Sequence, residues 1–206
     1  MEEVKGSGGL SPEGLERARA LVALYPQRRS ALIPLCHLAQ GEHGFLTVEA
    51  MEDIAALTGL TPAEVRGTAS FYDMLHTEPV GRHVIAVCTN IACMLAGAYE
   101  LLEAVEERLG IAPGQTTEDG EFTLEEAECL AACDVAPCAQ VNHRFFGPLD
   151  AESFDKLATD LASGALGAQV PPHGVLCRVE RAVGLLSGVD RASDASPGSA
   201  DSGGRA

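Results

Sequence analysis

HVIAVCTNIACMLAG, residues 83–97, places two cysteines directly after a short apolar run. Residues 83–87 include Val, Ile and Val and predict a buried strand. Apolar residues then recur at helical spacing from about Cys93 to Leu109, which predicts a long helix ended by Gly110. The stretch therefore predicts a strand, a turn and a helix, with two thiols just after the strand.

A second cysteine pair follows a second candidate strand. ECLAACDVAP, residues 128–137, comes after a candidate strand at residues 121–124, and residues 140–142 and 144–146 together predict one further strand with a turn beside it. Asp150 is a candidate N-cap for a last helix, whose apolar residues share one face. The order β-α-β-β-α predicts a compact α/β layer.

The chain upstream of this layer has a helical pattern throughout. Helices are predicted at about 11–25, 30–40, 47–58 and 61–71, the first opened by Ser11-Pro12 and the last by a capping box of Thr61 and Glu64. The fold class is therefore α+β. The predicted parts are a flexible leader (1–10), a helical bundle (11–78), the α/β domain (79–165), a C-terminal extension (166–186) and a disordered tail rich in Ser, Gly and Asp (187–206).

Composition excludes several functions. The 206 residues include 30 acidic and 14 basic ones, a net charge of −16, which disfavours nucleic acid and anionic lipid as partners. No apolar run approaches the roughly 20 residues of a membrane-spanning helix, and the N-terminus lacks the pattern of a secretory signal. We expect a cytoplasmic protein, whose seven cysteines then indicate metal binding or redox chemistry rather than disulfides.

The two cysteine pairs have the spacing of a four-thiolate site. Four residues separate Cys88 from Cys93, and three separate Cys129 from Cys133. Thiolates suit iron bridged by sulfide and also zinc, so spacing leaves both open. Buried free cysteines are a third interpretation. No cysteine pair has the two-residue spacing of a dithiol enzyme.

VCTNIACMLAG (87–97) and ECLAACDVAP (128–137) resemble the thioredoxin-like [2Fe-2S] subunit of NADH:quinone oxidoreductase, respiratory complex I, called the NuoE type in bacteria. GTASFYDML, residues 67–75, is similar to a G-x-x-S-F-Y segment of that family. The resemblance covers roughly residues 11–165 and favours iron over zinc. It implies a helical bundle before a thioredoxin-like domain, with one [2Fe-2S] cluster on Cys88, Cys93, Cys129 and Cys133.

The resemblance also implies a function in electron transport. Such a chain is an electron-transfer subunit of NADH:quinone oxidoreductase and docks on the flavin-bearing, NADH-oxidising subunit among other peripheral-arm subunits. FMN and NADH then bind the partner, and this chain has no substrate site. The complex would place it at the cytoplasmic face of the inner membrane. The alternatives are the equivalent subunit of an NAD-linked formate dehydrogenase or hydrogenase, a free-standing thioredoxin-like ferredoxin, and a zinc-held interaction module without redox activity.

Several residues near the motifs receive separate predictions. Ala131 stands where the family usually has Gly, and Ala fits if its φ is negative. Cys36 is predicted to be core packing, and Cys138 a partly buried free cysteine, with a spare thiol near the cluster as the alternative. Glu128 and Asp134 either face the cluster and lower its potential or are solvated carboxylates. Cys177 is assigned no role.

Overall fold

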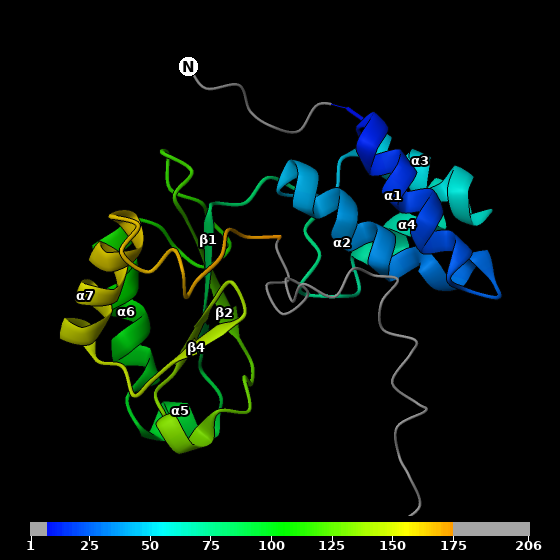
Figure 1. Ribbon diagram of the computed structural model, residues 1–206. Helices are drawn as coiled ribbons and strands as arrows, with labels where there is room; N and C mark the ends of the chain where they lie inside the picture. Colours follow the sequence, from blue (N-terminus) through cyan, green and yellow to red (C-terminus); the bar gives the residue numbers. More distant parts are fainter. Residues whose placement is uncertain (1–7, 175–206) are drawn as a thin grey trace, which may run out of the picture. The chain divides into compact units, whose positions relative to one another are not determined.

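The structure, a computed structural model, describes residues 8–174. The helical region contains α1 (Pro12–Ala23), a 3-10 turn (Arg28–Ala31), α2 (Leu32–His43), α3 (Val48–Thr58) and α4 (Pro62–Ala69) (Figure 1). The predicted tail at 187–206, most of the predicted extension and the first seven residues of the predicted leader lie outside the described residues.

The predicted helix caps form as hydrogen bonds. Ser11 Oγ accepts from the Gly14 amide at 2.9 Å, and Thr61 and Glu64 form the predicted capping box. The helices surround a hydrophobic cluster made of buried residues between Leu10 and Leu75, with Cys36 inside it as predicted. Burying such an apolar stripe from each helix is what holds short helices together in water.

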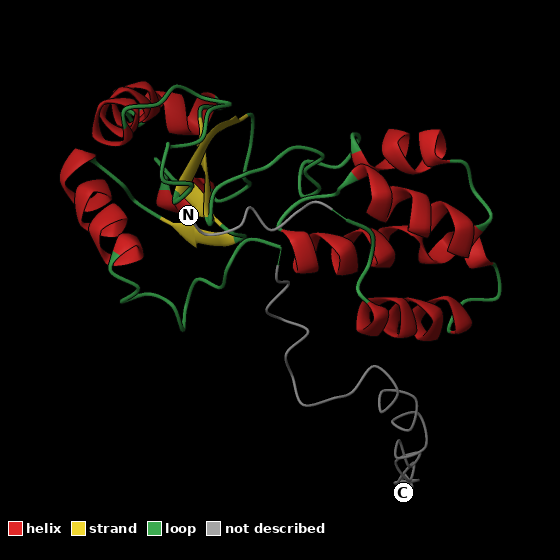
Figure 2. Cartoon of the chain, turned by 90° about the horizontal axis from the view of Figure 1, so that it is seen from above, coloured by secondary structure: helices red, strands yellow, loops and turns green. Residues whose placement is uncertain are grey.

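The α/β region is a four-stranded mixed sheet with helices. It contains β1 (His83–Cys88), α5 (Ile91–Leu95), α6 (Ala98–Leu109), β2 (Phe122–Ala127), β3 (Ala139–Val141), β4 (Arg144–Phe146) and α7 (Ala151–Ala162). The strand order is β2-β1-β3-β4, with β1 parallel to β2 and antiparallel to β3. Figure 2 shows that the strands are confined to this part of the described chain. The predicted α+β class is confirmed.

The long helix predicted from about Cys93 is interrupted. Gly97 has a φ of 99°, so α5 ends at Leu95 and α6 starts at Ala98. Only glycine adopts this backbone conformation at little cost, which is why the chain can turn here and place Cys93 in a separate short helix. The hydrophobic spacing alone does not reveal the interruption, because Leu95 continues the apolar pattern of the predicted helix although it is 80% exposed in the structure.

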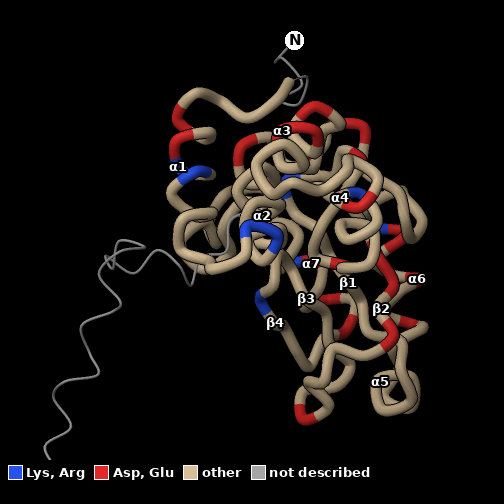
Figure 3. Tube along the Cα trace, turned by 90° about the vertical axis from the view of Figure 1, so that its right-hand side faces the viewer, with Lys and Arg blue, Asp and Glu red and all other residues tan. Residues whose placement is uncertain are grey.

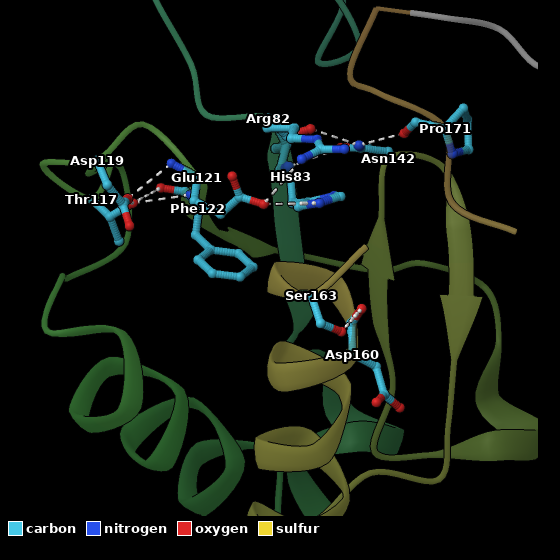
Figure 4. A network of polar contacts seen from close by, with 11 residues as sticks. Arg82, His83, Thr117, Asp119, Glu121, Phe122, Asn142, Asp160, Ser163 and Pro171 are labelled. Atoms are coloured by element: carbon cyan, nitrogen blue, oxygen red, sulfur yellow. Dashed lines mark hydrogen bonds and ion pairs between the residues drawn. The ribbon is translucent and has the colours of Figure 1, made fainter. Parts of the chain in front are cut away.

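Helices α6 and α7 lie beside each other on one face of the sheet (Figure 1), and the buried side chains of both join strand residues such as Ile85 and Leu124 in one core. At the other end of β1, Asn142 ties three segments together. Its Oδ1 accepts from the Val84 amide at 2.8 Å, and its Nδ2 donates to the carbonyls of Arg82 and Pro171 at 2.8 and 2.7 Å (Figure 4). These bonds hold the segment after α7 against the sheet.

Acidic positions outnumber basic ones along the trace in Figure 3, in keeping with the net charge of −16. Among residues 8–174 there is no helix with the length and hydropathy needed to cross a bilayer.

Candidate metal centre

The two cysteine pairs follow neighbouring parallel strands. Cys88 is the last residue of β1 and is in register with Ala127, the last residue of β2. The Thr89 amide donates to the Ala127 carbonyl at 3.0 Å, so the strands separate only beyond this point. Because the carboxyl ends of parallel strands meet at one edge, the loop carrying Cys129 begins next to Cys88.

Three thiols gather at this edge. Cys88, Cys93 and Cys138 have Sγ atoms within 4.8 Å of one another, and all three residues are buried. The Sγ atoms of Cys93 and Cys138 are 3.7 Å apart. Residues of the 128–137 loop pack against them, Leu130 and Val135 included. The structure therefore joins Cys88 to Cys93, as the predicted site requires, and adds a third cysteine.

The other two predicted ligands lie outside this group. Cys129 and Cys133 are both exposed, on the loop between β2 and β3. Each iron of a two-iron cluster takes two terminal thiolates, so its four sulfurs need not share one sphere. The donor set fits such a cluster: a buried pair is provided by β1 and α5, and a loop pair starts beside Cys88.

Cys138 lies deeper in the structure than predicted. The sequence predicts a partly buried free cysteine, with a spare thiol near the cluster as the alternative. Cys138 is fully buried and its thiol contacts Cys93, which favours the alternative. The register explains the position: Val87 pairs with Ala139, so Cys138 lies beside Cys88 where β1 and β3 meet. No local pattern indicates this pairing, because the two strands are far apart in the chain.

Backbone amides point at the buried sulfurs. Burial opposes ionisation of Cys88, yet hydrogen bonds from the backbone of Leu130 and Asn90 hold the pKa of its thiol below the ordinary value. Burial raises the pKa of Cys93, and the backbone N–H of Cys138 offsets part of this effect. Burial, with Cys93 next to it, raises the pKa of Cys138 to about 12. Amide donors of this kind are what a buried anionic cluster needs.

The acidic neighbours are solvated. Glu128 and Asp134 are both exposed, which favours the solvated alternative predicted for them. Glu126, also exposed, accepts a hydrogen bond from Thr89 Oγ1 at 2.7 Å and so connects the ends of β1 and β2.

Ala131, between the two exposed cysteines, has a φ of 56°. The condition under which alanine would fit without strain, a negative φ, is therefore not met. The loop adopts the left-handed conformation that a glycine would take there, and alanine accepts it at a cost of roughly 1–2 kcal/mol.

A histidine-lined cavity of about 650 Å³ lies on the sheet next to the loop, and its lining includes His76, His143, His173 and Cys129. His76 and His173 stack edge to face with ring centroids 4.6 Å apart. Burial lowers the pKa of all three histidines, that of His173 to about 3. They are therefore neutral near pH 7.

A model of the thioredoxin-like [2Fe-2S] ferredoxin family matches residues 18–162. The chain belongs to this family. It is 45% identical over 142 residues to a subunit of the NADH-quinone oxidoreductase of Rhizobium meliloti, covering 69% of this chain and 84% of that protein. It is 40% identical over 173 residues to an NADH-quinone oxidoreductase subunit of Mycobacterium tuberculosis, covering 84% and 68%. The resemblance inferred from the cysteine motifs is confirmed.

A solved structure shares the family's fold with this chain. An NAD+-reducing [NiFe]-hydrogenase in the air-oxidized state matches with a TM-score of 0.61 and 28% identity. The match covers 68% of this chain but only 24% of the hydrogenase chain. The likeness thus concerns one part of a larger protein.

Proposed function

We propose that this chain is the electron-transfer subunit of an NADH:quinone oxidoreductase, holding one [2Fe-2S] cluster on Cys88, Cys93, Cys129 and Cys133. The observation that carries the proposal is the position of both cysteine pairs at the carboxyl ends of parallel β1 and β2, in a chain of the thioredoxin-like [2Fe-2S] family. The relatives named as NADH-quinone oxidoreductase subunits support the parent complex.

When bound, the cluster supplies one-electron redox chemistry. The protein's own contribution is to hold and shield the sulfurs. Cys88 and Cys93 are buried and receive backbone hydrogen bonds, which stabilise negative charge there. Cys129 and Cys133 lie on the exposed side, where a partner can approach. This arrangement suits electron exchange with the FMN of an NADH-oxidising subunit, which also binds NADH.

The proposed partners and cellular location follow from the proposed complex. We place the flavin-bearing subunit and other peripheral-arm subunits as partners, and the cytoplasmic face of the inner membrane as the location. The equivalent subunit of an NAD+-reducing hydrogenase is the second candidate, supported by the structural match. Purifying the tagged chain from its native cells and identifying the flavoprotein that accompanies it separates the two.

Metal analysis tests the cluster directly. Anaerobically purified chain should be red-brown, with about two iron and two acid-labile sulfides per chain. Stoichiometric zinc in a colourless protein would instead support an interaction module held by zinc and would refute the electron-transfer role.

A further inference from the structure

Cys138 contacts a proposed ligand but is not one of the four. Its side chain is fully buried, and its Sγ lies 3.7 Å from Cys93 Sγ, a distance at which one sulfur donates a hydrogen bond to the other. Once Cys93 binds iron it is a thiolate without a proton. Only Cys138 can then be the donor.

The backbone holds Cys138 in this position independently of the loop ligands. The Cys88 amide donates to the Cys138 carbonyl at 3.0 Å, and the neighbouring residue Ala139 pairs with Val87 in the sheet. Cys138 therefore faces Cys93 from the edge of β3.

We propose that the Cys138 thiol is a hydrogen-bond donor to the cluster ligand Cys93 and raises the cluster's reduction potential. The inference rests on the proposed function, since it needs Cys93 to be a ligand. Cys138 is packed among apolar residues such as Ala98 and Leu130, and its Sγ is 3.7 Å from Cys93 Sγ, so the thiol is held at hydrogen-bonding distance from that ligand.

The physical effect follows from charge. One electron added to the cluster increases the negative charge on Cys93 Sγ, so a donated hydrogen bond stabilises the reduced state more than the oxidised state. No bond breaks, and the thiol proton stays on Cys138. Removing the donor makes reduction less favourable.

The test is a reductive titration of the full, cluster-bearing chain followed by electron paramagnetic resonance. In Cys138→Ala we expect the ratio of reduced to oxidised cluster at a fixed potential to fall by about threefold to tenfold, tenfold being about 59 mV for one electron. Cys138→Ser keeps a donor and should return the ratio to within about twofold of wild type. Cys36→Ala, in the helical core, is the matched control and should leave the potential unchanged.

The outcomes separate the two proposals. A wild-type chain without iron would overturn the proposed function and the donor role together. Iron-loaded Cys138→Ala with an unchanged potential would overturn only the donor role. Loss of iron in both Cys138 variants, with Cys36→Ala still loaded, would make Cys138 a ligand and also overturn the donor role.

Discussion

The Cys88 amide nitrogen donates a hydrogen bond to the Cys138 carbonyl across 3.0 Å, at the point where β1 and β3 separate. The sheet thus determines where Cys88 and Cys138 lie, while Cys129 and Cys133 depend on an exposed loop. The proposed cluster site accordingly has one part held by the sheet, around Cys88, and one part on the exposed loop with Cys129 and Cys133. Variants in each part test a different half of the ligand set.

Serine at Cys88, Cys93, Cys129 or Cys133 should remove or distort the cluster, because a harder oxygen ligand binds sulfide-bridged iron poorly. Iron content and the visible absorption of anaerobically purified variants measure this. Cys36→Ser, equally buried but in the helical core, is the control and should keep the wild-type spectrum. If Cys138→Ser bleached the protein as fully as Cys133→Ser, the ligand assignment would be wrong.

Ala131→Gly should stabilise the loop that carries the exposed ligands. Glycine adopts the φ of 56° without the roughly 1–2 kcal/mol cost that alanine bears. If about 1 kcal/mol of this relief stabilises the loaded loop, cluster loss to an iron chelator should slow about fivefold. Ala132→Gly is the matched control: its φ of −112° is negative, so glycine there relieves no left-handed strain. Equal bleaching rates for wild type and Ala131→Gly would show that the positive φ at Ala131 does not weaken the loop's hold on the cluster.

Buried His173 should make folding sensitive to acid. Its pKa falls from 6.5 to about 3 through burial, with His76 and His143 adding to the effect, so the unfolded chain takes a proton below pH 6.5 and the folded chain does not. Stability present above pH 6.5 is therefore lost as the pH falls toward 3. Glu125, whose Oε1 lies 3.8 Å from His76 Nδ1, and Asp73 are among the carboxyl groups that line the same cavity.

His173→Phe removes the imidazole that takes up a proton on unfolding and keeps an aromatic ring against His76. Between about pH 7 and about pH 5.5, wild type should lose about 1 kcal/mol more of its free energy of unfolding than the variant. Urea unfolding at both pH values measures the difference. Parallel losses in the two proteins would show that His173 does not carry the effect.

The helical region provides no proposed ligand and has a hydrophobic cluster of its own. A chain starting at Val80 should therefore still assemble the cluster, yet bind its flavoprotein partner much more weakly if the helices serve docking. Iron content and partner pull-down, measured on the same preparation, give the answer.

Phe71→Ser in the full chain is the matched variant for that test. Phe71 belongs to the G-x-x-S-F-Y segment and is 78% exposed, so the fold should tolerate its loss. Weaker pull-down with normal iron content would support docking through this segment. Full partner binding by a folded, iron-loaded chain that starts at Val80 would exclude a docking role for the helices.

The sequence by itself determined the local features and the family. Ser11, Thr61 and Asp150 cap helices as predicted, because a cap depends on residues three positions apart. The apolar run at β1 and the spacing of the cysteine pairs were equally readable. Each of these signals is contained within a few consecutive residues.

Only the tertiary structure decided where Cys138 lies and how the chain turns at Gly97 and Ala131. Cys93 and Cys138 are 45 residues apart and meet through the pairing of β1 with β3, which depends on burial of the whole sheet. The positive φ at Gly97 and Ala131 likewise follows from what each turn must connect. Such long-range constraints leave no local pattern, since they are satisfied only when the core assembles.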